Sequence, residues 1–130
     1  MKKSKYTYLK DGFEGILYDT ESEDDRLLIV IQGLKGLELP EKYAGLFAEK
    51  RYSVLAMTYY GAPGLPDTMR AIPLEMFQTA IDRMKEYGSG KYRRFGIYGN
   101  SKGAGMTLLA ASVVPDISLV IAASTLYSQT

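Results

Sequence analysis

Short runs of consecutive apolar residues recur along the chain and are separated by segments in which apolar and polar residues mix. An unbroken apolar run of this length is typical of a strand that is covered on both faces, as in a parallel sheet. The runs therefore predict buried strands at residues 26–32, 54–57, 95–98 and 119–123.

Between these runs, apolar residues lie three and four positions apart, which places them on one face of a helix. The spacing predicts helices at residues 40–50, 73–87 and 102–114. Pro40 suits a first helical position, Gly88 and Gly90 end the second helix, and Pro115 ends the third. The core-facing residues are expected to be Tyr43, Leu46 and Phe47, then Phe77, Ala80, Ile81 and Met84, then Met106, Leu109 and Ala110.

The N-terminal part has a different pattern. Aromatic-rich runs at residues 6–10 and 13–18 flank the pair Asp11-Gly12. An Asp-Gly pair favours a two-residue hairpin turn, because both turn positions need a positive φ. Residues 21–25 are polar and charged and predict a solvated loop.

A hairpin followed by alternating strands and helices predicts an α/β fold. Parallel strands in such a fold are joined by right-handed helical crossovers. We expect about six strands in a single domain over residues 1–130.

Composition and charge narrow the function. The net charge is +1, which gives no electrostatic case for binding nucleic acid or an anionic membrane. There are no cysteines and no histidines, so thiolate chemistry is excluded and a histidine base must come from outside these residues. No metal or cofactor is expected. The basic start is not followed by the apolar stretch of a signal peptide, and a cytoplasmic location is expected.

The segment Gly99-Asn100-Ser101-Lys102-Gly103 matches the pattern G-x-S-x-G. It lies between a predicted strand and a predicted helix, as a nucleophile elbow requires. Glycine is expected at 99 and 103 because neighbouring backbone passes close by, and Gly105 would extend the small-residue face of the helix. The alternative is an ordinary glycine-rich turn in which the serine caps the helix. A phosphate-binding loop does not fit, because Ser101 and Gly103 stand where its glycine and hydroxyl residue belong.

In a serine hydrolase of this kind, backbone amides stabilise the oxyanion. The Lys102 amide would lie at the helix N-terminus. A second donor is expected from residues 33–36, with Leu34 as the first choice.

Three blocks of sequence, at residues 59–66, 72–77 and 96–103, carry a more specific signal. In this order and spacing they resemble the C-terminal hydrolase domain of acyl-CoA thioesterases and of bile acid-CoA:amino acid N-acyltransferases, which are α/β-hydrolases. Dienelactone hydrolases are a more distant likeness. The resemblance runs from about Leu27 onward. It implies a triad of Ser or Cys with Asp and His, with Ser101 as the nucleophile, and an acyl-thioester or ester substrate. Serine at this position resembles the thioesterases more than the transferases.

The resemblance places the Asp and His beyond the strand that follows the elbow helix, whereas Asp116 precedes that strand and is expected to be a turn residue. We therefore expect a truncated α/β-hydrolase that is close to inactive alone. The last strand would leave an apolar edge, which we expect a second copy or the C-terminal half to cover. The alternative is a non-catalytic remnant that self-associates or binds another protein.

Overall fold

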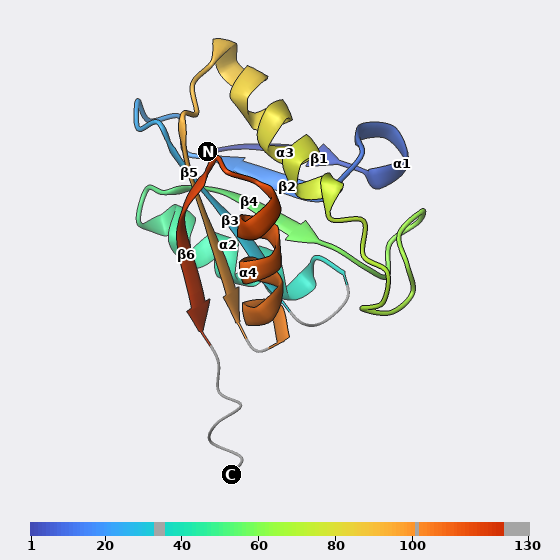
Figure 1. The fold of residues 1–130 in the computed structure, drawn as a ribbon. Coiled ribbons are helices and arrows are strands. Elements are labelled where there is room, and N and C mark those ends of the chain that lie inside the picture. Colours follow the sequence, from blue (N-terminus) through green and yellow to red (C-terminus); the bar gives the residue numbers. More distant parts are fainter. Residues whose placement is uncertain (33–35, 101, 124–130) are drawn as a thin grey trace.

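The fold is a three-layer α/β sandwich around one mixed sheet (Figure 1). The computed structural model describes residues 1–32, 36–100 and 102–123. The sheet has six strands in the order β1-β2-β4-β3-β5-β6. β1 and β2 are antiparallel to their neighbours, and β4, β3, β5 and β6 run parallel. The predicted α/β architecture with about six strands is confirmed. The strands are Lys2–Tyr6 (β1), Glu14–Asp19 (β2), Arg26–Gln32 (β3), Ser53–Thr58 (β4), Arg94–Asn100 (β5) and Ile117–Ala123 (β6).

The helices lie on both faces of the sheet. α3 and α4 cover one face and α2 covers the other (Figure 1). The bounds are Tyr8–Asp11 (α1), Glu38–Glu49 (α2), Glu75–Glu86 (α3), Tyr87–Ser89 (a 3₁₀ turn, η1) and Lys102–Val113 (α4). None of the described helices is long and apolar enough to cross a bilayer.

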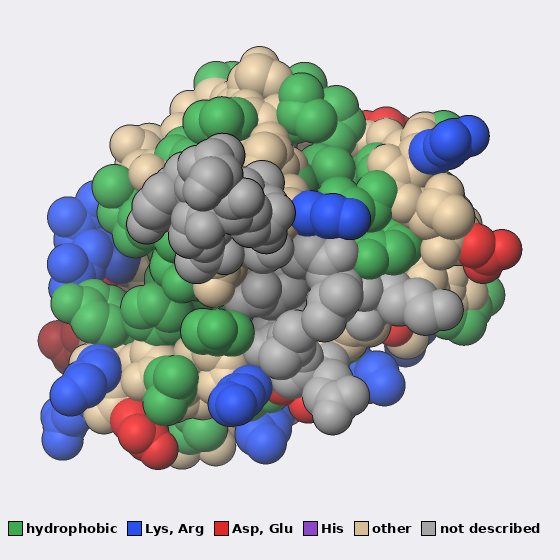
Figure 2. Space-filling view, turned by 90° about the horizontal axis from the view of Figure 1, so that it is seen from below, with side chains coloured by type: hydrophobic (Ala, Val, Ile, Leu, Met, Phe, Trp, Pro, Cys, Tyr) green, Lys and Arg blue, Asp and Glu red, His purple; other side chains and the backbone are tan. Residues whose placement is uncertain are grey.

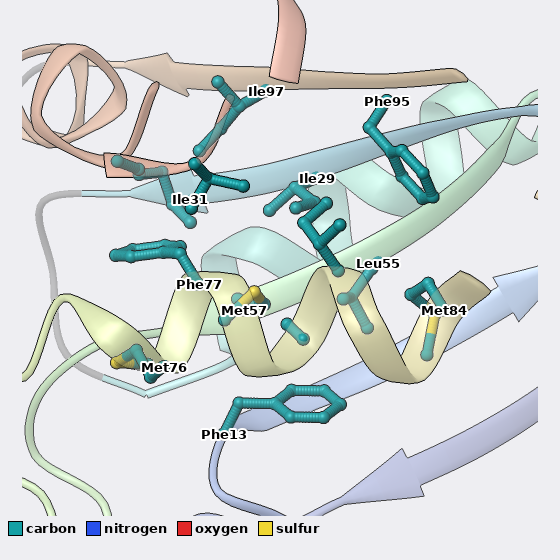
Figure 3. Packing of buried hydrophobic residues seen from close by; sticks show 14 of the residues in the cluster. Phe13, Ile29, Ile31, Leu55, Met57, Met76, Phe77, Met84, Phe95 and Ile97 are labelled. Carbon is teal, nitrogen blue, oxygen red and sulfur yellow. The ribbon is translucent and has the colours of Figure 1, made fainter. Parts of the chain in front are cut away.

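The main core lies between the sheet and α3. In the view of Figure 3, Phe77 of α3 lies beside Ile31 of β3, and Met84 lies toward Leu55 of β4. All six residues of β4 are buried, as expected for a strand covered on both faces. The predicted inward face of α3 is confirmed, because Phe77, Ala80, Ile81 and Met84 are all fully buried.

The N-terminal hairpin forms, but its predicted turn is wrong. One helical turn, α1, connects β1 to β2, and only Gly12 takes a positive φ, of 83°. The Asp11 carboxylate accepts the Thr7 N–H at 2.9 Å, and Gly12 N–H donates to Tyr8 O at 2.9 Å. These bonds favour the helical turn over a two-residue turn. β1 also begins earlier than the aromatic pattern indicated, at Lys2.

The expected inward positions of α2 and α4 are partly wrong. Among the α2 residues whose burial is described, Ala44 is buried, Tyr43 and Phe47 flank the Tyr98 ring, and Leu46 is exposed. On α4, Met106 and Ala110 are buried as predicted, but Leu109 is exposed. Apolar residues surround α4, so their spacing does not mark one face. The buried face combines Met106 with the small residues Gly103, Ala104, Thr107 and Ala110, which let the helix approach β5 closely.

Candidate functional site

The candidate site is the corner between β5 and α4 at the carboxyl ends of the parallel strands. β5 ends at Asn100 and α4 begins at Lys102, so a single residue connects a central strand to a helix. That residue is Ser101, which lies outside the described residues. Ligand sites of open α/β sheets lie outside the carboxyl ends of the strands. The corner therefore stands where chemistry is expected in this fold.

Gly99 has a steric reason to be glycine. A β-carbon at this position would lie 2.4 Å from the Gly103 carbonyl oxygen and 2.4 Å from the Thr107 methyl carbon. Real β-carbons do not approach backbone oxygen so closely, so any side chain would push α4 away from β5. Gly103 is buried in the first turn of α4. The tightness of the corner thus depends on the absence of a side chain at position 99.

Gly105 does not share this constraint. It is exposed, and a β-carbon there would meet nothing within 4 Å. The expectation that it extends a packed small-residue face is wrong, since it points away from the sheet. Lys102 is exposed in the first turn of α4.

The loop after β3 starts beside this corner. β3 and β5 are paired in parallel with Gln32 opposite Asn100, so the segments that follow them leave the sheet at adjacent points. Leu34, the expected second oxyanion donor, lies outside the described residues. Gly36 is described, with a φ of 85°.

Thr58, which the sequence did not single out, ties this loop to β4. Its side chain is buried, and its hydroxyl accepts the Gly36 N–H at 3.1 Å and donates to the Tyr60 carbonyl oxygen at 3.1 Å. One hydroxyl therefore links the loop after β3 to the loop after β4. No sequence pattern signals this role, because threonine is common in strands.

Tyr59, beside Thr58, is also fully buried. Its hydroxyl has no hydrogen-bond partner among the described residues, and burial raises its pKa to about 12. It stays protonated at neutral pH and does not act as a base there.

A buried charged cluster lies at the opposite end of the parallel strands, where they begin. The Asp19 carboxylate accepts hydrogen bonds from Lys91 Nζ at 2.5 Å, and from Tyr87 and Tyr92, each at 3.0 Å. Burial alone would raise the pKa of Asp19, but the hydrogen bonds from Lys91, the Glu21 N–H and the two tyrosines lower it. The cluster joins the end of β2 to the segment before β5, and all its groups are partnered.

Asp116 also lies at this end of the strands, directly before β6. It pairs with Lys85 and accepts a hydrogen bond from Gln78 at 3.4 Å, and the bond from Lys85 lowers its pKa. It is a turn residue far along β6 from the corner, as predicted. Among the described residues, no group of three acidic side chains is placed to hold a metal ion.

Comparison with known proteins gives sequence and fold relatives. No family model matches the chain. Human acyl-coenzyme A thioesterase 1 is 34% identical over 83 residues, which is 64% of this chain and 20% of the relative. Rat mitochondrial acyl-coenzyme A thioesterase 2 is 32% identical over 83 residues, or 64% of this chain and 18% of the relative. The chain thus spans about one fifth of the length of the curated relatives it matches.

Solved structures share the architecture. The Pyrococcus furiosus esterase Pf2001 matches with a TM-score of 0.64 at 19% identity, over 98% of this chain and 50% of that chain. The α/β-hydrolase GrgF from Penicillium sp. sh18 matches with a TM-score of 0.68 at 17% identity, over 92% of this chain and 44% of that chain. The predicted resemblance is confirmed at this level: the chain has the α/β-hydrolase fold, and its curated homologues are acyl-CoA thioesterases.

Proposed function

We propose that this chain carries the nucleophile of a serine hydrolase that transfers acyl groups from a thioester or ester to water. The observation that carries the proposal is the corner between β5 and α4, where Gly99 contacts Gly103 and only residue 101 separates strand from helix. A serine at such a corner projects its hydroxyl beside the first amides of the helix. The thioesterase homologues support an acyl-CoA thioester as substrate.

In the proposed reaction, Ser101 Oγ attacks the acyl carbonyl and transfers its proton to a base. The amides of Lys102 and Leu34 stabilise the oxyanion, and the protonated base gives its proton to the leaving sulfur or oxygen, which departs as a thiol or an alcohol. Water, which passes a proton to the same base, then attacks the acyl-serine ester; the carboxylic acid is released and Ser101 recovers its proton. Gly99 and Gly103 shape the turn. These steps use no metal or cofactor.

The base is not among the 130 residues, which contain no histidine. We propose that this polypeptide alone turns over slowly, because losing the base of a serine triad costs on the order of 10⁶ in turnover. A histidine supplied from outside these residues would complete the site. A histidine and an aspartate from another polypeptide segment are the natural partners for Ser101.

Chemical rescue tests this proposal. Purified chain is assayed with an acyl-CoA and a p-nitrophenyl ester, with and without added imidazole as a replacement base. We expect a slow rate that imidazole raises for the wild-type chain and not for Ser101→Ala. Ser112→Ala is the matched control, since Ser112 is an exposed serine on the same helix. Equal rescue of Ser101→Ala and wild type would remove Ser101 from the reaction.

The second candidate is a non-catalytic module that self-associates, which the uncharged strand β6 supports. The two candidates separate cleanly, because Ser101→Ala abolishes imidazole-dependent hydrolysis and leaves self-association unchanged.

A further inference from the structure

The loop after β4 is closed by its own hydrogen bonds at the carboxyl end of the strands. It includes residues 59–66, one of the three blocks that carry the resemblance to the thioesterases. The Gly61 N–H donates to the Pro66 carbonyl oxygen at 2.7 Å, and the Leu65 N–H donates to the Ala62 carbonyl oxygen at 2.9 Å. The Leu65 side chain is buried in the main core. These bonds and this anchor make the loop a firm point to which a neighbouring segment can be attached.

α1 packs against the same loop. A β-carbon at Gly64 would lie 2.6 Å from Leu9 Cδ2 and 3.0 Å from Tyr8 Cδ2. α1 is in turn attached to the sheet, because the Tyr8 N–H donates to the buried Glu14 carboxylate at 2.9 Å. Glu14 lies directly opposite Thr58 in the antiparallel pair of β2 and β4. The loop is thus held between the core and α1, in a set position relative to Thr58.

The Thr58 hydroxyl connects this loop to the segment that follows β3. It donates to the Tyr60 carbonyl oxygen and accepts the Gly36 N–H, each at 3.1 Å, and only 2% of Thr58 is exposed. Because the proton points to Tyr60, a lone pair of the oxygen is left to face Gly36. Figure 2, which views the carboxyl ends of the strands, shows hydrophobic side chains over much of this face. A hydrogen bond that is buried among such side chains is stronger than the same bond in water.

We propose that Thr58 is a positioning residue for the second oxyanion donor. This inference rests on the proposed function, in which the segment between β3 and Gly36 supplies that donor. Thr58 acts through Gly36: its hydroxyl fixes the described end of the segment against the firm loop after β4. Donors that are held in place before the reaction stabilise the oxyanion best, and a misplacement of about 1 Å can cost on the order of 10²-fold in rate.

The kinetics of imidazole-rescued hydrolysis of a p-nitrophenyl ester test the proposal on the 130-residue chain. At a constant imidazole concentration, Thr58→Val should lower kcat by about 10²-fold and leave KM unchanged, because the oxyanion forms only in the transition state. Thr58→Ser keeps the hydroxyl and should return kcat close to the wild-type value. A contribution to stability alone would not separate kcat from KM in this way.

Thr20→Val is the matched control. The Thr20 hydroxyl lies 3.2 Å from both Ser53 Oγ and Ser22 Oγ, where β4 begins, so this change also removes a bridging hydroxyl beside the same strand. Thr20 lies at the end of the strands opposite the corner between β5 and α4. Its replacement should leave kcat and KM at their wild-type values. Equal losses of kcat in Thr20→Val and Thr58→Val would indicate a general loosening of the fold and would overturn the proposal.

Three further results would overturn the positioning role: an unchanged kcat in Thr58→Val, an equal fall for serine and valine, or a rise in KM at constant kcat. Hydrolysis that persists in Ser101→Ala would remove the proposed function and the role of Thr58 with it. A Ser101-dependent rate that Thr58→Val leaves unchanged would remove the role of Thr58 alone, so the two failures are distinguishable. Should Thr58→Val fail to fold, as judged by circular dichroism, Thr58→Ala replaces it with the same expected results.

Discussion

The two ends of the parallel strands differ in how their polar groups are held. Ion pairs dominate the end where the strands begin, and backbone contacts and a hydroxyl dominate the end where they finish. At the first end, carboxylates are paired: Asp24 with Arg26 and Asp25 with Arg94, each at 2.7 Å, and Asp19 with Lys91. At the second end, the described features are close backbone contacts at Gly99 and a hydroxyl bridge at Thr58. The comparison teaches that ion pairs hold the end where the parallel strands begin, while close backbone packing at Gly99 and the hydroxyl of Thr58 hold the described part of the end where they finish.

Asp19→Asn, at the end where the parallel strands begin, should lower the free energy of unfolding more than any other change considered. The change keeps the shape of the side chain but leaves Lys91, only 17% exposed, without its counter-charge. Breaking a buried ion pair costs about 3–5 kcal/mol, and the partial exposure of Lys91 favours the lower end. Urea unfolding at fixed protein concentration measures the loss. Asp116→Asn is the control, because its pair with Lys85 is more exposed and should cost about 0–1 kcal/mol.

The Asp19 carboxylate should also make the stability of the fold depend on pH in the acidic range. The pKa of Asp19 is lowered in the folded state, so its ionised form favours folding. That stabilisation is complete above the ordinary aspartate pKa of about 3.9 and is lost as the pH falls through the lowered folded value. Wild-type stability should therefore fall more steeply below about pH 4 than that of Asp19→Asn. Parallel pH profiles for the two proteins would show that Asp19 does not contribute this stabilisation.

Gly99→Ala, at the end where the parallel strands finish, should cause the next largest loss of stability. The added methyl would overlap the Gly103 carbonyl, which belongs to helix backbone and cannot move alone. Overpacking costs typically about 1–3 kcal/mol, and we expect about 2 kcal/mol together with loss of imidazole-rescued hydrolysis. Gly105→Ala is a control of opposite sign. It adds the same methyl in open space on the same helix and should stabilise by about 0.5–1 kcal/mol. Equal effects of the two changes would refute a steric role for Gly99.

The sequence predicted those features of the fold that depend on the local pattern of apolar residues. The buried strand at residues 26–32 and the apolar face of α3 follow from periodicity alone. The exposure of Leu46 and Leu109 does not, because apolar residues stand on more than one face of each helix and periodicity does not say which face meets the sheet. The partnership of Asp19 with Lys91 joins positions 72 residues apart and depends on which strands are neighbours. The strand–helix corner could be recognised from the sequence because the close contact between strand and helix excludes a side chain at position 99, and this requirement appears as a glycine in the motif.

Thr58→Val should have the smallest effect on stability, and it sharpens the comparison most directly. Valine keeps the branched shape but removes the hydroxyl, so the Gly36 N–H loses this acceptor and the hydrogen bond to the Tyr60 carbonyl oxygen is no longer made. Because Gly36 is half-buried, we expect a cost of about 1 kcal/mol. Amide exchange at Gly36 should accelerate, while exchange in the β3 and β4 ladders stays slow. Thr58→Ser keeps the hydroxyl and should restore protection at Gly36. If serine and valine gave the same exchange rate at Gly36, packing of the Thr58 methyl would hold the loop, and the hydroxyl bridge would not be what shapes this end of the strands.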